Sequence, residues 1–179
     1  MNYSLDRFAM IKKYNIAYIP VSHIATIINL ARHFSPIADR YLLGEHSLPH
    51  VTLYQFTMDD SEIENVWEKI TFAFNETHIK LTFDEFSCIT FDHETYWASL
   101  LPNNYDVLIK MHHLVANILK MPINNAYDPH MTLMNTKNKK YESEVEKLKA
   151  KYVPVTDIFT LALGECDAAG QLIKILYFM

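Results

Sequence analysis

Apolar and polar positions alternate along the chain with two different periods, which predicts a mixture of helices and strands. Four segments repeat apolar residues at every third or fourth position, as amphipathic helices do. Short runs rich in β-branched and aromatic residues lie between them and predict strands. The predicted helices are 22–34, 62–74, 105–119 and 141–151. The predicted strands are 16–21, 48–56, 79–83, 86–91, 96–101, 131–134, 155–163 and 172–178.

The order of these elements repeats. Each half of the chain contains a helix, a strand, a second helix and then further strands. No Pro/Ser-rich linker or low-complexity segment separates the halves. We therefore expect residues 1–179 to form one α+β domain with two lobes.

A five-residue motif occurs twice, at corresponding places in the two halves. Residues 49–53 read PHVTL, and residues 129–133 read PHMTL. Side chains alternate between the faces of a strand, so each histidine shares a face with the threonine two residues on, about 6–7 Å away. The apolar residues of each motif point to the other face, toward the core. Two such pairs in a short chain indicate one site built by duplication.

The same alternation suggests which residues line this site. Tyr54 is expected to continue the face of His50 and Thr52, and Met134 that of His130 and Thr132. An aromatic side chain there can stack on a nucleobase. Packing in the core is the alternative reading of such residues.

Tyr127 is a further candidate substrate contact because it lies three residues before His130. The remaining histidines show no catalytic or metal-binding pattern. His46 precedes His50 by four residues, but Pro49 makes helical geometry improbable there, so we assign no metal. His112 and His113 are adjacent on a predicted helix, where we expect polar surface roles.

Charge and glycine content narrow the classes of function. The chain of 179 residues carries a net charge of -5, which argues against broad binding to a nucleic-acid duplex. The three glycines, Gly44, Gly164 and Gly170, lie far apart. No glycine-rich phosphate loop of a nucleotide triphosphatase or dinucleotide oxidoreductase is present. A small nucleotide or the end of an RNA fits this composition.

Cysteine usage and hydropathy predict the compartment. No secretory signal is recognisable, so Cys88 and Cys166 are expected to be reduced and buried. Residues 1–13 carry charges among their apolar residues, and no run elsewhere approaches the roughly 18 apolar residues of a membrane span. We expect a soluble, cytoplasmic monomer with no membrane contact.

Two histidines that face each other across a phosphate can act as base and acid in one displacement. A neutral imidazole accepts a proton near pH 7 and an imidazolium donates one, so the pair requires no metal ion. The threonine hydroxyls can donate hydrogen bonds to the phosphate oxygens as charge builds up on them. The chemistry of the repeat therefore points to a phosphodiester as the substrate.

PHVTL and PHMTL resemble the paired His-x-Thr-hydrophobic motifs of the 2H phosphoesterase superfamily. The superfamily includes RNA 2',3'-cyclic phosphodiesterases and the so-called 2'-5' RNA ligases. The resemblance implies two pseudo-symmetric lobes of antiparallel sheet flanked by helices, with a central cleft. It also implies catalytic roles for His50, His130, Thr52 and Thr132, without cofactor or metal, on a cyclic or 2'-5' phosphodiester. It leaves the base and acid roles open between the two histidines.

One position departs from the family pattern. Several members carry a basic residue just after the second motif, where this chain has Asn135 and, two residues on, Lys137. Lys137 is therefore a candidate to supply part of that charge at the substrate. The departure also supports a second hypothesis, a nucleotide-binding or sensing module with little turnover. A 2'-5' RNA ligase working with the same residues is a third.

Overall fold

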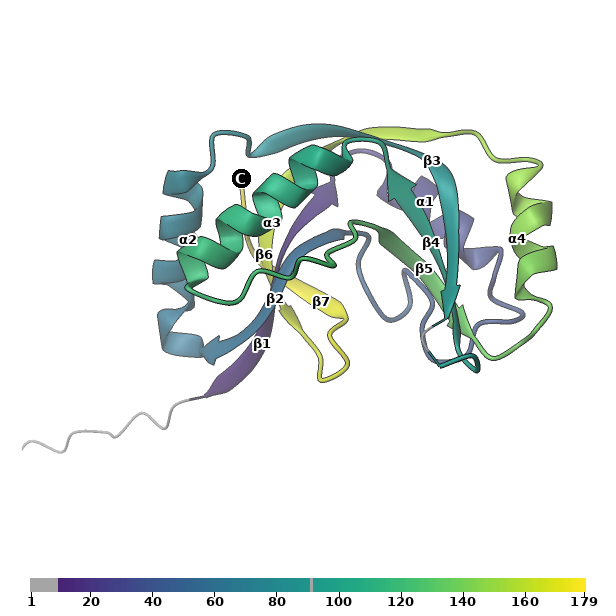
Figure 1. Ribbon diagram of the computed structural model, residues 1–179, viewed down its shortest axis with the longest axis horizontal. Helices are drawn as coiled ribbons and strands as arrows, with labels where there is room; N and C mark the ends of the chain where they lie inside the picture. The colour runs from purple at the N-terminus through teal and green to yellow at the C-terminus, as the bar shows by residue number, and fades with distance from the viewer. Residues whose placement is uncertain (1–9, 91) are drawn as a thin grey trace, which may run out of the picture.

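Seven strands and four α-helices make up the described residues of the computed structural model, 10–90 and 92–179 (Figure 1). The strands are β1 (Ile11–Pro20), β2 (Val51–Asp59), β3 (His78–Thr90), β4 (Tyr96–Pro102), β5 (Met131–Thr136), β6 (Val155–Cys166) and β7 (Leu172–Phe178). The helices are α1 (Ile24–Arg32), α2 (Ile63–Ala73), α3 (Tyr105–Leu119) and α4 (Tyr141–Lys149), with a 3-10 turn at Asp60–Glu62. The four predicted helices are confirmed within two residues at each end.

All seven strands join one antiparallel sheet. The strand order is β2-β1-β6-β3-β4-β5, and β7 pairs with β6 beside this path. The two motif strands, β2 and β5, are thus at opposite edges of the sheet. The sheet bends into an arch, and the first residues of β2 and β5 meet near its middle (Figure 1). The expected α+β fold of two antiparallel lobes is confirmed.

Strand β3 joins the two lobes and corrects the prediction of two separate strands at 79–83 and 86–91. Residues 78–83 pair with β6, and residues 83–90 pair with β4. The polar pair Asp84-Glu85 interrupts the apolar run where the register shifts and the strand changes partner. The backbone continues through this point because a change of partner needs no turn. Phe91, the last residue of the predicted strand, lies outside the described residues.

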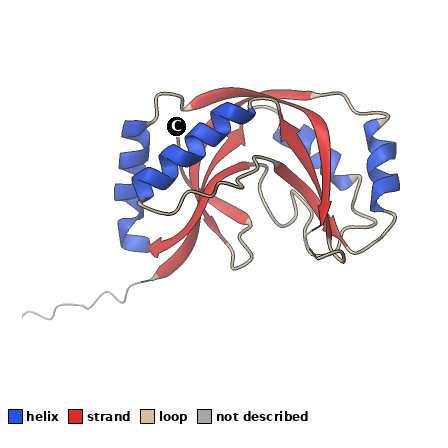
Figure 2. Ribbon diagram, viewed as in Figure 1, coloured by secondary structure: helices blue, strands red, loops and turns tan. Residues whose placement is uncertain are grey.

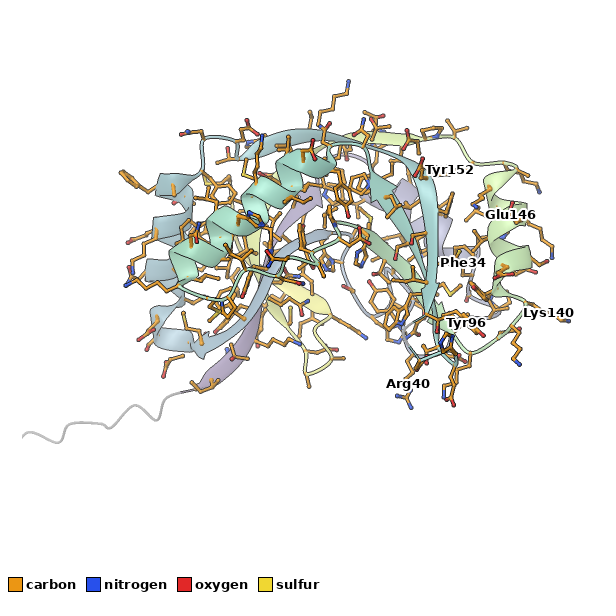
Figure 3. The ribbon with its side chains drawn as sticks, in the orientation of Figure 1. Phe34, Arg40, Tyr96, Lys140, Glu146 and Tyr152 are labelled. Carbon is orange, nitrogen blue, oxygen red and sulfur yellow. The ribbon has the colours of Figure 1, made fainter. Side chains whose placement is uncertain are left out.

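Helices cover the outer faces of the arch (Figure 2). Helix α3 packs against β2 and α2, while α1 contacts β5 and α4 contacts β3. Tyr96 of β4 stacks on Tyr141 of α4 with ring centroids 4.3 Å apart, and Phe34, just after α1, is fully buried (Figure 3). The helices therefore leave the inner face of each lobe for a site.

Two sequence predictions concern burial and targeting. Cys166 is buried, but Cys88 is only half-buried, and both are free thiols. No helix in the described part of the chain is long and apolar enough to cross a membrane. The prediction that residues 1–13 form no targeting or membrane segment falls largely outside the described residues, which begin at Met10.

Candidate active site

The two motif histidines stand immediately before the first residues of β2 and β5. His50 precedes Val51, and His130 precedes Met131. In the ribbon, the starts of these two strands lie near the middle of the arch (Figure 1). Charge on His130 is close enough to affect the pKa of His50. The structure therefore brings the two halves of the sequence repeat into one place.

Both imidazoles are held in the same way. The Nδ1 atom of His50 lies 2.6 Å from the carbonyl oxygen of Leu48, and that of His130 lies 2.6 Å from the carbonyl oxygen of Asp128. A carbonyl oxygen only accepts hydrogen bonds, so Nδ1 carries the proton in both rings. This fixes the ring orientation and leaves each Nε2 atom available to a substrate.

The surroundings of His50 favour its neutral form. Burial lowers the pKa of His50 to about 4, the hydrogen bond to Leu48 opposes the shift, and charge on His130 adds to it. His50 is half-buried, so its charged form loses part of its hydration and the neutral ring is preferred. At neutral pH, His50 is therefore ready to accept a proton at Nε2.

Tyrosine hydroxyls fix the backbone of both motif threonines. The Tyr127 hydroxyl donates to the carbonyl oxygen of Thr52 at 2.6 Å, and the Tyr41 hydroxyl donates to that of Thr132 at 3.4 Å. Each tyrosine comes from the chain segment that leads into the other motif. The two hydrogen bonds thus cross between the halves and hold the two motif strands in a fixed relation.

The Thr52 hydroxyl has a buried partner of its own. Asn15 of β1 is fully buried, and its Nδ2 atom donates to Thr52 Oγ1 at 2.9 Å. Because the Thr52 oxygen accepts this bond, its own proton is free for a phosphate oxygen. Sequence reasoning missed Asn15, since nothing in its local pattern links it to Thr52.

A β-bulge in the first motif strand corrects the placement of Tyr54. The β1–β2 register passes from Ile16–Tyr54 to Ala17–Thr52 and skips Leu53. Residues paired across strands share a face, and neighbours along a strand alternate. Tyr54 therefore lies on the face opposite Thr52, where its ring stacks on His112 of α3. The expectation that it continues the catalytic face is wrong.

The second motif strand has a bulge at the equivalent residue. The β4–β5 register passes from Ala98–Met134 to Ser99–Thr132 and skips Leu133. Met134 is fully buried in the core and is not available to a substrate, contrary to expectation. The third residue after each threonine, Gln55 or Asn135, takes the next place on the inner face instead.

His112 is a buried support of the site, which corrects the expected surface role. It is 3% exposed, and its ring stacks on Tyr54 at 5.3 Å and on Tyr127 at 4.2 Å. Its Nδ1 atom bonds the carbonyl oxygen of Leu53, the bulge residue, at 2.7 Å, and its Nε2 atom accepts from Asn124 N–H at 3.2 Å. The hydroxyl of Tyr127 holds the backbone at Thr52 and its ring stacks on His112, while its role as a substrate contact stays a prediction.

Lys137 does not lie at the histidine pair. It follows β5, seven residues after His130, which is about 20 Å at the usual strand rise. Its Nζ atom pairs with Glu94 at 3.8 Å. The expected supply of charge beside the second motif is therefore not provided by Lys137.

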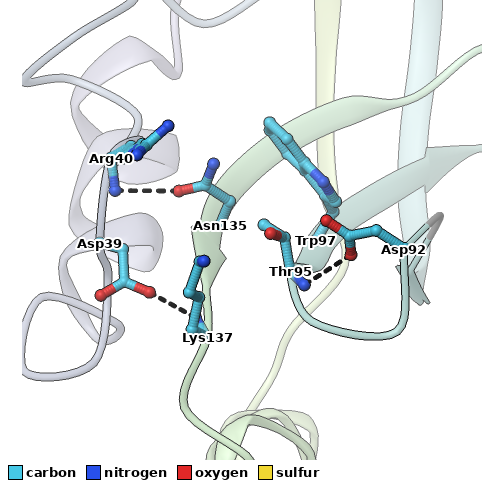
Figure 4. Close-up of a pocket in the computed structure, with 7 residues that line it drawn as sticks. All are labelled: Asp39, Arg40, Asp92, Thr95, Trp97, Asn135 and Lys137. Atoms are coloured by element: carbon cyan, nitrogen blue, oxygen red, sulfur yellow. Dashed lines mark hydrogen bonds between the residues drawn. The ribbon is translucent and has the colours of Figure 1, made fainter.

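A cavity of about 350 Å³ opens beside the far end of β5 (Figure 4). Arg40, Trp97, Asn135 and Lys137 line it, while neither His50 nor His130 does. Within the described residues, no cluster of three or more His, Cys, Asp or Glu side chains could hold a metal ion.

Comparison with known protein families shows which family this chain belongs to. The model of the 2'-5' RNA ligase superfamily matches residues 20–163, a range that contains both motifs and both histidines. The chain belongs to the 2'-5' RNA ligase superfamily. Membership in this superfamily, together with the fold, supports a nucleotide-processing function of the 2H phosphoesterase type.

Solved structures share the fold of this superfamily member along almost its whole length. Escherichia coli LigT complexed with 3'-AMP is 16% identical, with a TM-score of 0.66, and the match covers 95% of this chain and 98% of LigT. A structure described as a phosphoesterase is 14% identical, with a TM-score of 0.62, over 95% of this chain and 98% of that one. A search of curated proteins found no match. At these identities the likeness establishes the fold.

Proposed function

We propose that the protein is a metal-independent phosphodiesterase of the 2H type that acts on a 2',3'-cyclic phosphate or a 2'-5' or cyclic oligonucleotide. The observation that carries this proposal is the matched pair of imidazoles, each pinned through Nδ1 to a carbonyl oxygen at 2.6 Å. Identical anchoring leaves two Nε2 atoms for one phosphate. LigT, which shares the fold, is described in complex with 3'-AMP.

In the proposed mechanism, His50 is the base and His130 the acid. The low pKa of His50 keeps its Nε2 atom unprotonated at neutral pH, so it can take a proton from water or a ribose hydroxyl. The attacking oxygen then forms a bond to phosphorus, and the bond to the leaving oxygen breaks. His130 gives a proton from Nε2 to that oxygen as the bond breaks.

The threonine hydroxyls stabilise the charge that develops during this step. Thr52 accepts from Asn15 and so can direct its proton at a non-bridging phosphate oxygen. Thr132 occupies the equivalent place after His130, and we propose the same role for it. Donors fixed in advance toward developing charge are a large source of rate enhancement in enzymes.

Turnover measurements test the proposal. A panel of 2',3'-cyclic nucleotides, 2'-5' oligoadenylates and cyclic oligonucleotides is incubated, with chelator present, with the wild type, His50→Ala and His130→Ala. His33→Ala, at an exposed histidine just after α1, is the matched control. We expect turnover by wild type and control only, with losses of about 10²–10⁴-fold in the two motif variants.

Two other outcomes separate the remaining hypotheses. Nucleotide binding without turnover by the wild type, and unchanged in both motif variants, would favour a binding or sensing module. Joining of RNA fragments, seen by product analysis and lost in the same variants, would favour the ligase. Turnover that collapses with chelator would contradict the metal-independent mechanism.

A further inference from the structure

We propose that the cavity lined by Arg40 and Trp97 is a second nucleotide subsite, which binds the part of an oligonucleotide that extends beyond the reacting phosphate. The inference rests on the proposed function, and it narrows the substrate to a chain of two or more nucleotides. Arg40 and Trp97 lie on opposite sides of Asn135, and the cavity is lined by residues 39–40 on one side and by Trp97 of strand β4 on the other (Figure 4).

The cavity continues the inner face that carries the catalytic threonine. Ser99 of β4 is paired with Thr132, and Trp97, two residues before it, is paired with Asn135. Side chains two residues apart share a face, so the Trp97 indole lies on the Thr132 side of the sheet. Asn135 is five residues beyond His130, about 15 Å at the usual strand rise. A mononucleotide at the histidines leaves this cavity empty, whereas a longer chain reaches it.

The segment that carries Arg40 is held in place by Asn135. The Asn135 Oδ1 atom accepts from the backbone N–H groups of Arg40 at 3.1 Å and Tyr41 at 2.9 Å. The backbone N–H of Leu43 donates to the carbonyl oxygen of Leu133, two residues before Asn135 on β5. Asn135 is 6% exposed, so this amide acts as a buried anchor rather than as a ligand. The base of the Arg40 side chain is thereby fixed beside the cavity.

The Arg40 guanidinium has no partner among the described residues and can therefore bind an anion. Lys137 pairs with Glu94, whereas the exposed Arg40 side chain makes no hydrogen bond or ion pair with the described residues. The two acidic residues of the lining already accept backbone hydrogen bonds. Asp39 accepts from Lys137 N–H, and Asp92 accepts from Thr95 N–H at 2.7 Å and from Glu94 N–H at 2.9 Å.

An aromatic face beside an unpaired guanidinium fits one nucleotide unit. The half-buried Trp97 ring offers a stacking surface that every nucleobase can use. Arg40 offers paired N–H donors whose geometry matches phosphate oxygens. The cavity volume of about 350 Å³ lies in the range of small-molecule sites. Phosphate at Arg40 and base on Trp97 would hold the distal nucleotide and align the diester at the histidines.

Fluorescence titration tests the subsite without requiring turnover. The chain has two tryptophans, so Trp67→Phe leaves Trp97 as the single tryptophan, which is excited selectively over tyrosine at long wavelength, and the phenylalanine keeps a ring against Tyr177. In this background, the probes are 3'-AMP and a tetra-adenylate with a 3'-phosphate, in 3'-5' and 2'-5' forms. Arg40→Gln is compared with Arg32→Gln, an exposed arginine at the end of α1.

We expect tetra-adenylate to quench Trp97 emission and Arg40→Gln to raise its Kd about tenfold, while Arg32→Gln leaves the Kd unchanged. The Kd of 3'-AMP should be the same in all these proteins. An unchanged Kd in Arg40→Gln, or no response of Trp97 to tetra-adenylate, would overturn the subsite. Absence of turnover with these binding results intact would overturn only the proposed function, so the two failures are distinguishable.

Discussion

At the scale of single residues, we propose that environment gives different roles to the histidines of two closely similar motifs, PHVTL and PHMTL. Burial and the neighbouring His130 depress the pKa of His50 to about 4. The base must be neutral, so on the acidic side of the profile kcat/KM falls only when the pH drops below this pKa. We expect the acid limb of the kcat/KM profile near pH 4, well below the usual histidine value of about 6.5. Steady-state rates across pH, with folding monitored by circular dichroism, provide the check.

Thr52 is the second residue whose role can be measured. Thr52→Val keeps the shape of the side chain but removes the donor that Asn15 leaves free. We expect kcat to fall about 10²-fold, since loss of one donor to developing charge has an effect of that order. Thr57→Val, on the same strand but exposed, is the matched control. Equal kcat in the two variants would remove Thr52 from the mechanism.

At the scale of elements, periodicity predicted the helices and most strands, and it predicted the inner face only as far as each threonine. His50 with Thr52, and His130 with Thr132, follow plain alternation. The bulges at Leu53 and Leu133 come from pairing with β1 and β4, so no pattern within β2 or β5 reveals them.

The same limitation explains two other errors in the element predictions. His112 lies on a helix whose buried side is defined by β2 and by Tyr127, which are distant in sequence. The apolar pattern breaks at Asp84-Glu85 and so predicts two strands, whereas in the structure these residues mark a change of partner strand. In each case a residue or strand distant in sequence determines the local structure.

The contacts of His112 with the β2 bulge and with the two tyrosines can be tested by one substitution. His112→Ala removes a ring between two tyrosines and leaves Leu53 O and Asn124 N–H without their partner. Buried unpaired groups are costly, so we expect unfolding free energy to fall by about 2–4 kcal/mol. His113→Ala, at the half-buried neighbouring position, should change it by less than about 1 kcal/mol. Urea denaturation measures the unfolding free energy of both variants. Similar losses in the two would contradict the supporting role of His112.

At the scale of the whole molecule, the candidate active site lies where two edge strands of one sheet begin near each other. The motif repeat predicted that the two histidines come together, and it predicted the two-lobed antiparallel fold through family resemblance. It did not predict the strand order, because β6 and β3 are each shared between neighbours from both lobes. Sequence periodicity describes one strand at a time.

The crossed tyrosines test how the halves are held together. Tyr127→Phe keeps the ring on His112 but removes the 2.6 Å bond to Thr52 O. We expect a loss of about 1 kcal/mol in stability and a lower kcat with little change in KM. Tyr41→Phe removes a bond of 3.4 Å and should have the smaller effect. Thermal melts report the stability and steady-state kinetics report kcat. A larger effect of Tyr41→Phe than of Tyr127→Phe would contradict the roles given to these two hydrogen bonds.

The central claim is that His50 and His130 share one proton-transfer cycle, with His50 as base and His130 as acid. The most direct measurement compares hydrolysis of a nucleotide 4-nitrophenyl phosphodiester with that of the matching alkyl ester. A nitrophenolate leaves without protonation, so it does not need the acid. We predict that His130→Ala loses about 10²-fold less rate on the nitrophenyl ester than on the alkyl ester, while His50→Ala loses the same on both. Equal rate losses of His130→Ala on the two esters would contradict this assignment. So would a smaller rate loss of His50→Ala on the nitrophenyl ester than on the alkyl ester.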